Sequence, residues 1–220
     1  MSQMVLETVI ELEHSFFLFL NGLEGNIFLD RFMYISAFIL IYSVPFYLVY
    51  EWFNGSKGKK NSIMLFIGIL FTIFFVASLG HVYVRERPNM EYDTGFEISE
   101  TTSYLNNPLT IINKSLLVSE DSFPSNHMAV MLGFLIPLFW IKGMSSSTKI
   151  FVVFTILMGI GRIYIGRHFL LDYSGSLLFA GLGFLHLNIL NRFFEEHIES
   201  ITKFFHDKEN KLFRRSFFSG

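Results

Sequence analysis

The sequence predicts an all-α integral membrane protein: a helical bundle of about five transmembrane helices, preceded by a helix that lies at the membrane interface. Of the 220 residues, 51% are hydrophobic, 28 are Phe and only 16% are charged, whereas about 25% of the residues in soluble domains are charged. Long apolar runs come close to the roughly 20 residues that cross a bilayer. The lysines and arginines are divided unequally between the two ends of these runs, as in membrane proteins of fixed orientation.

The first segment, residues 4–22, is predicted to be the interfacial helix. Its apolar residues are interrupted by Glu7, Glu11, Glu13 and His14, a mixture that suits the surface of a membrane. No basic stretch precedes it and no small-residue cleavage site follows, so the pattern is not that of a removable signal peptide. A sixth span in this region remains an alternative.

The predicted spans are residues 32–50, 62–84, 123–141, 148–165 and 169–190. The fourth span is short and carries Arg162 near one end, so this end is expected in the headgroup layer, where a long cationic side chain can reach water. With the interfacial helix, the spans would form one membrane-embedded domain, residues 1–193. Residues 194–220 would be a cytoplasmic tail, which either rests on anionic lipid or extends into solvent.

The distribution of Lys and Arg orients the predicted bundle. With five spans, six of the 17 basic residues fall on the side of the long loop 85–122, and eleven fall on the other side. The positive-inside rule places the side with eleven in the cytoplasm. We therefore expect a multi-pass protein of the plasma (inner) membrane whose N-terminus and loop 85–122 face the extracytoplasmic side.

The loop 85–122 is the only long connection between predicted spans, and it is acidic. Loops of this length are uncommon in compact domains unless they are functional or disordered. One interpretation is that the loop contains a short helix that covers the outer end of the bundle.

Two residues at the start of the fifth span form a candidate catalytic pair. His168 and Asp172 are four residues apart, so on a helix they would share one face. The carboxylate could then accept the Nδ1 proton of the imidazole and leave Nε2 free to attack phosphorus. The N-terminus of the same helix would attract an anion. A purely structural cap is the alternative.

The start of the third span carries the motif Pro124-Ser125-Asn126-His127. Pro124 suits the first turn of a helix, for which Asp121 or Ser122 would be the N-cap. The free N–H groups of that turn and the Ser125 hydroxyl could hold phosphate oxygens, and His127 could protonate a leaving oxygen. An ordinary helix start with a bystander histidine is the alternative.

Three arginines, Arg85, Arg87 and Arg162, lie near the outer ends of the second and fourth spans. A single arginine at such a position often only anchors a helix at the interface. Three of them beside two histidines favour phosphoryl transfer, because guanidinium groups can bind the equatorial oxygens of a transferring phosphoryl group. Alternating spans would bring all of these residues to one face, and the pattern contains no evident cluster of metal ligands.

The order and spacing of these motifs resemble the type 2 phosphatidate phosphatases, in the acid phosphatase and vanadium haloperoxidase superfamily. The family signature is Lys-x6-Arg-Pro, then Pro-Ser-x-His, then Ser-Arg-x5-His-x3-Asp. The second part is complete at residues 124–127, and the third runs from Arg162 to Asp172. The sequence departs from the signature at Gly80, which stands in the place of the lysine, and at Gly161, which stands in the place of the serine.

The resemblance implies a metal-independent phosphatase that forms a phosphohistidine and needs no cofactor. Carried over by position, the catalytic residues are the nucleophile His168, its orienting partner Asp172 and the acid His127. The residues that would bind phosphate are Arg87, Ser125 and Arg162. We expect Arg85 to supply the charge that Gly80 lacks, with His81 as a further candidate.

The surroundings of the second motif and the N-terminal segment resemble the bacterial undecaprenyl-diphosphate phosphatases linked to bacitracin resistance. This resemblance implies a lipid phosphate in the membrane as substrate, with undecaprenyl diphosphate the first choice. Phosphatidylglycerophosphate, phosphatidate and lipid A phosphatases share the scaffold, and a lipid phosphotransferase would need the same phosphoenzyme. The apolar spans disfavour a haloperoxidase, and the motifs disfavour a non-enzymatic membrane protein. No nucleic-acid partner is expected, and the sequence indicates no particular protein partner.

Overall fold

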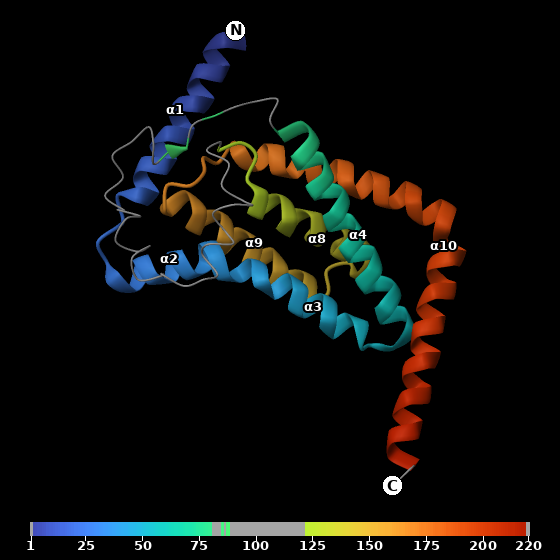
Figure 1. Cartoon of the computed structure of the whole chain (residues 1–220). Coiled ribbons are helices and arrows are strands. Elements are labelled where there is room, and N and C mark those ends of the chain that lie inside the picture. The colour runs from blue at the N-terminus through green and yellow to red at the C-terminus, as the bar shows by residue number, and fades with distance from the viewer. Residues whose placement is uncertain (1, 81–84, 86, 89–121, 219–220) are drawn as a thin grey trace.

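The computed structural model describes residues 2–80, 85, 87–88 and 122–218, and helices joined by turns and short loops make up the regular secondary structure of these residues (Figure 1). The predicted fold class, an all-α membrane bundle, is confirmed. The short helix predicted within the loop 85–122 falls almost wholly outside the described residues.

The first helices match the predicted interfacial segment and first span. Helix α1 (Ser2–Asn21) is followed by α2 (Ile27–Ile39), whose N-cap Asn26 accepts hydrogen bonds from the first backbone N–H groups of that helix. A 3₁₀ turn, η1 (Leu40–Tyr42), joins α2 to α3 (Ser43–Trp52) in a nearly continuous rod. The interruption precedes Pro45, which has no N–H to offer to the preceding turn.

Four further helices complete the bundle: α4 (Gly55–Leu79), α8 (Asn126–Lys142), α9 (Ser146–Tyr164) and α10 (Asp172–Phe218). By length and composition, four described stretches can cross a membrane: Ile27–Trp52, Gly55–Leu79, Ser146–Tyr164 and Asp172–Glu209. The third predicted span corresponds to α8, which is apolar but has only 17 residues. Each predicted span therefore has a helix, and the central one is short.

Helix α8 lies inside the bundle, with α4 and α10 on one side of it and α9 and α2 on the other (Figure 1). Close approach of α4, α8 and α10 depends on glycine. A Cβ at Gly133 would lie 2.5 Å from the Thr72 hydroxyl, and one at Gly183 would lie 2.6 Å from the same atom. The buried side chains around α8 form the main core and include Leu65, Met131, Phe134, Leu138, Phe151 and Met158. This packing fixes the relative positions of the ends of α8, α9 and α10.

Helix α10 does not end where the membrane domain was predicted to end. It continues from Asp172 to Phe218, bending on the way (Figure 1), so the proposed tail 194–220 is mostly an extension of the last span. Lys60 of α4 holds this extension by hydrogen bonds to Glu195 at 2.9 Å and Glu199 at 2.7 Å. Beyond residue 190 polar residues become more frequent, but residues 191–218 contain no proline or glycine. Because nothing in this stretch breaks a helix, the change of composition does not end α10.

Candidate active site

The motif residues predicted to act together meet at one end of the bundle. Arg162 belongs to the last turn of α9, and His168 lies in the turn between α9 and α10. Asp172 is the first residue of α10, and His127 is in the first turn of α8. Arg85 and Arg87 follow α4. The packing of α8, α9 and α10 fixes the positions of His127, Arg162 and Asp172, which lie in the terminal turns of these helices.

His168 is buried, with only 3% of its surface exposed, and both ring nitrogens have contacts. Its Nδ1 lies 2.8 Å from the carbonyl oxygen of Ser122 and 3.6 Å from Asp172 Oδ2. A carbonyl can only accept, so Nδ1 carries the proton and Nε2 has the lone pair. Arg162 Nη2 lies 3.3 Å from that Nε2. The ring is therefore held in the tautomer that a nucleophile at Nε2 requires.

The prediction that His168 and Asp172 share one face of a helix is wrong. Only Asp172 is helical, because the chain turns through residues 165–171 before α10 begins. The Asp172 carboxylate closes this turn by accepting the Phe169 backbone N–H at 2.7 Å. The two side chains still approach each other, and the nearest acceptor for Nδ1 is the Ser122 carbonyl rather than the carboxylate.

Burial lowers the pKa of His168 to about 4, and the nearby Arg162 and Arg87 charges act in the same direction. The Asp172 carboxylate opposes this shift but does not reverse it. The imidazole is therefore neutral at physiological pH, and its Nε2 lone pair is available.

Some buried polar atoms at this site have no hydrogen-bond partner among the described residues. Ser125 Oγ and Arg162 Nε are two of them, and both side chains are almost inaccessible to solvent. The Arg162 guanidinium contacts the Ala37 carbonyl at 3.4 Å and the face of Phe38, but no described carboxylate. Buried polar groups are normally hydrogen-bonded, so this part of the site has free capacity for an anionic ligand.

The start of α8 differs from the prediction. Ser125 is the N-cap in place of Ser122, and Pro124 precedes the helix instead of lying in its first turn. Asp121, the other predicted cap, lies outside the described residues. The Ser125 side chain makes no capping hydrogen bond, while its carbonyl accepts from Ser176 at 2.9 Å. The hydroxyl is thereby left for another partner.

His127 and Arg162 both lie close to the Phe38 ring. The Phe38 centroid is 6.3 Å from the His127 ring in an edge-on arrangement and 5.5 Å from the Arg162 guanidinium carbon. Helix α2, which carries Phe38, thus contributes an apolar ring that contacts both the candidate acid and the candidate phosphate-binding arginine.

Arg85 and Arg87 differ in their surroundings. Arg87 is buried, and its charge acts on His127 and His168. The Arg85 guanidinium is instead bound by carboxylates: Nη2 lies 2.6 Å from Glu13 Oε2, and Nη1 lies 3.3 Å from Asp172 Oδ1. The other candidate for the missing charge, His81, lies outside the described residues.

Sequence reasoning missed two residues at the site, Glu13 and Ser122. Ser122 had been considered only as a helix cap, yet its carbonyl accepts from His168 and its hydroxyl donates a short hydrogen bond to Asp172. Glu13 is a buried carboxylate of α1, 4% exposed. A carboxylate within the apolar part of α1 indicated that Glu13 could be functional, but its partner could not be predicted from the sequence.

The two departures from the family signature have steric explanations. A Cβ at Gly161 would lie 2.7 Å from the Met33 carbonyl oxygen, so any side chain there would push α9 away from α2. A Cβ at Gly80 would lie 3.1 Å from Pro124 Cδ, a tight contact with the second motif. Backbone atoms of α2 therefore occupy the space that a serine at position 161 would need, whereas a side chain at position 80 would require the Pro124 ring to shift by a few tenths of an ångström.

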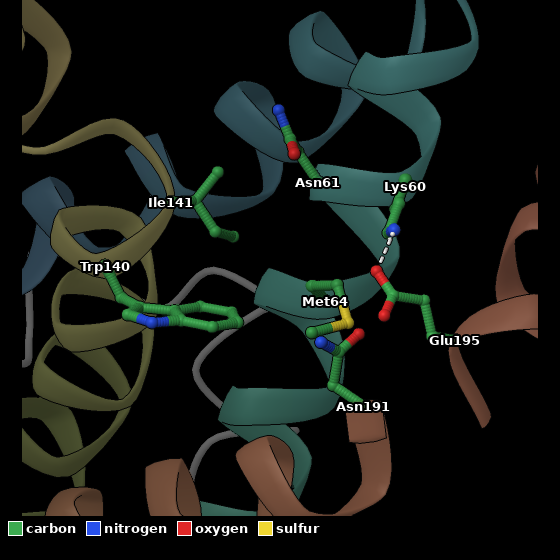
Figure 2. A pocket seen from close by; sticks show the side chains of 7 residues that line it. All are labelled: Lys60, Asn61, Met64, Trp140, Ile141, Asn191 and Glu195. Atoms are coloured by element: carbon green, nitrogen blue, oxygen red, sulfur yellow. Dashed lines mark hydrogen bonds and ion pairs between the residues drawn. The ribbon is translucent and has the colours of Figure 1, made fainter. Parts of the chain in front are cut away.

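The candidate catalytic residues do not line the cavity of about 220 Å³ in Figure 2. That cavity lies where α4, α8 and α10 meet at the other end of the bundle, and it is lined by Lys60, Asn61, Met64, Trp140, Ile141, Asn191 and Glu195. Its charged groups are paired with one another, as the Lys60–Glu195 contact shows. Within the described residues, no three His, Cys, Asp or Glu side chains are grouped as metal ligands.

Comparison with known proteins identifies the family. Residues 61–197 match the model of the PAP2 superfamily, so the chain belongs to this superfamily, as the motifs predicted. The chain is similar to an Escherichia coli K12 protein named "Putative undecaprenyl-diphosphatase YbjG", with 27% identity over 153 residues, 69% of this chain and 68% of that protein. It is also similar to the crystal structure of Aquifex aeolicus LpxE, with 18% identity, a TM-score of 0.49, and coverage of 80% of this chain and 94% of that one.

Proposed function

We propose that the protein is a membrane lipid phosphatase that hydrolyses undecaprenyl diphosphate to the monophosphate and inorganic phosphate through a phosphohistidine. One observation carries the chemistry. A buried neutral imidazole, His168, presents Nε2 beside Arg162, in a site where Arg162 Nε and Ser125 Oγ have no described hydrogen-bond partner. Family membership and the named relative support a phosphatase acting on a lipid phosphate.

In the first step, His168 Nε2 attacks the terminal phosphorus. The N–P bond forms, the P–O bond to the leaving lipid phosphate breaks, and His127 gives its proton to the leaving oxygen. Nδ1 keeps its proton, which points at the Ser122 carbonyl, so the phosphorylated ring is positively charged. The Asp172 carboxylate, 3.6 Å from Nδ1, stabilises that charge.

In the second step, water attacks the phosphohistidine. His127 now accepts the proton of the water, the N–P bond breaks, and its electron pair returns to Nε2 as inorganic phosphate forms. Arg162, Arg87 and Ser125 would bind the equatorial oxygens in both transition states. The described residues supply this charge stabilisation themselves, and we propose that the reaction requires no metal ion.

The position of the site favours a substrate whose tail remains in the membrane. Its residues lie at the ends of apolar helices, where a headgroup can reach them while a prenyl chain stays among the spans. Lys59, Lys60 and Lys142 gather at the opposite end of the bundle and contact α10 or α3 there. By the positive-inside rule, that end is cytoplasmic and the site faces the extracytoplasmic side.

The test is phosphate release by purified protein in detergent. Undecaprenyl diphosphate, phosphatidylglycerophosphate, phosphatidate and lipid A are compared at equal concentration, with and without EDTA. The expected result is highest kcat/KM on undecaprenyl diphosphate, undiminished by EDTA. A preference for another lipid would replace the substrate, and loss of activity that magnesium restores would contradict the mechanism. Phosphorylated lipid product in place of inorganic phosphate would indicate a phosphotransferase.

A further inference from the structure

Helix α1 reaches the candidate active site through a buried carboxylate. Glu13 Oε1 accepts the Leu171 backbone N–H at 2.6 Å, and Glu13 Oε2 accepts from Arg85 Nη2 at 2.6 Å. Burying a carboxylate is costly unless it is paired and hydrogen-bonded. Both oxygens of Glu13 are used in this way, and both partners belong to segments that shape the surroundings of His168.

Aromatic packing holds the same face of α1 against the turn that carries His168. The Phe169 ring stacks with His14 at 5.2 Å and meets Phe17 edge-on at 5.5 Å. The Arg85 guanidinium carbon lies 4.0 Å from the Phe169 centroid. Glu13, His14 and Phe17 are on one helical face, so α1 docks on this turn by a continuous contact.

Arg85 connects Glu13 to the catalytic machinery in two ways. Its Nη1 donates to Asp172 Oδ1 at 3.3 Å, and its carbonyl oxygen accepts the Ser122 N–H at 2.6 Å. Ser122 in turn contacts both His168 and Asp172. The salt bridge between Glu13 and Arg85 therefore influences both the Asp172 carboxylate and the Ser122 carbonyl, the two groups that hold the His168 imidazole.

The charges of these groups suggest why two carboxylates share one arginine. Arg85 alone would neutralise Asp172, and the phosphorylated, positively charged imidazole would lose its counter-ion. Glu13 takes up the positive charge of Arg85, so the cluster of Glu13, Arg85 and Asp172 keeps a net charge of about −1 beside His168.

We propose that Glu13 is a positioning residue of the active site, which acts through Arg85 and the Leu171 amide to preserve the negative charge and the orientation of Asp172. This rests on the proposed phosphatase function. The proposal also changes the function assigned to Arg85. The absence of the signature lysine had led us to expect that Arg85 binds phosphate directly, whereas here it positions Asp172.

The experiment compares kcat and KM for Glu13→Gln, Arg85→Gln and the double variant, on whichever lipid the wild type hydrolyses best. Glu13→Gln should lower kcat about tenfold with KM nearly unchanged, because a neutral cluster stabilises the phosphorylated imidazole less. The double variant should recover a kcat clearly above that of Glu13→Gln, because removing both charges restores the net −1 on Asp172. Glu13→Asp should retain more activity than Glu13→Gln.

Glu11→Gln is the matched control, since Glu11 is an exposed carboxylate of the same helix. It should have wild-type kinetics. A merely structural contact predicts a different pattern, in which the double variant is slower than either single variant. That pattern, or wild-type kcat in Glu13→Gln, would overturn the proposal, as would a large rise of KM confined to variants of Arg85.

The wild type and His168→Gln are measured alongside. Absence of phosphate release from any lipid by the wild type, or full activity in His168→Gln, refutes the phosphatase mechanism itself. Normal wild-type turnover with an inactive His168→Gln and a silent Glu13→Gln refutes only the positioning function of Glu13.

Discussion

The two ends of the bundle both bury charged side chains, but they differ in how these charges are compensated. At the end with Lys59 and Glu51, each buried charge has an opposite charge: Lys59 contacts Glu209 at 2.6 Å, and Glu51 contacts Lys142 at 2.6 Å. At the other end, buried Arg162 has no described carboxylate partner.

This difference separates a structural network from a candidate active site better than burial does. Glu51 also accepts a hydrogen bond from Asn61 at 2.8 Å, and Lys59 donates to the Trp52 carbonyl at 3.1 Å, so these groups fix α3, α4, α8 and α10 to one another. The free hydrogen-bonding capacity of Ser125 and Arg162 serves no such purpose. A folded protein keeps such capacity at the expense of stability, which is common where a ligand must bind.

The largest effect is expected for His168→Gln, which should abolish phosphate release. Glutamine fills a similar space but cannot form the phosphoenzyme, so the covalent route is lost. The measurement is inorganic phosphate released by purified protein at matched folded concentration, together with trapping of an acid-labile phosphoenzyme in the wild type. Release within tenfold of wild type would contradict the assignment of the nucleophile.

A smaller loss is expected for His127→Ala. Removal of a general acid typically costs ~10² to 10⁴ in rate and leaves a slow reaction through the intact nucleophile. Substrates with better leaving groups need less protonation, so a nitrophenyl phosphate should be affected much less than phosphatidate, whose leaving group is an alkoxide. If both substrates lose the same factor, His127 does not act as the acid.

At the opposite end of the bundle, Glu51→Gln should reduce stability and leave specific activity unchanged. The neutral amide keeps the shape but leaves Lys142 without its counter-ion, at a cost of about 1–3 kcal/mol. The Tm in detergent should fall by several degrees. Glu196→Gln, an exposed change on α10, is the control and should leave Tm unchanged. If fully folded Glu51→Gln had a lower kcat than the wild type, the end with Glu51 would not be purely structural, and the distinction between the two ends would be wrong.

Much of the fold was predictable because apolar run length is a local property. Each predicted span overlaps a helix whose first residue lies within seven residues of the predicted start, and α8 is shorter than expected because it begins at Asn126, after the cap. The continuation of α10 past residue 193 was not predicted, because composition changes there while helix propensity does not.

The candidate site was predictable as a set of residues but not as a set of contacts. The motifs identified His168, Asp172, Arg162 and Ser125, and the structure brings them together. The sequence could not reveal that Ser122 holds Nδ1 or that Glu13, 158 residues from Leu171, binds its amide. Contacts between distant segments depend on how the helices pack, and the spacing of residues within a motif does not predict that packing.

A change of pH tests the burial of His168 directly. Its folded pKa of about 4 lies below the ~6.5 of an exposed histidine. Well above pH 6.5 His168 is almost entirely unprotonated in both the folded and the unfolded state. As the pH falls toward 4 the unfolded state gains a proton that the folded state does not, so this group removes stability, by about 2 kcal/mol at pH 5. Between pH 7 and pH 5, the Tm of the wild type should therefore fall about 4–8 °C more than that of His168→Gln, measured in the same detergent. If the Tm of both proteins changed with pH in the same way, His168 would be accessible to solvent. The candidate active site would then not contain a buried neutral imidazole, and the contrast between the two ends would be weakened.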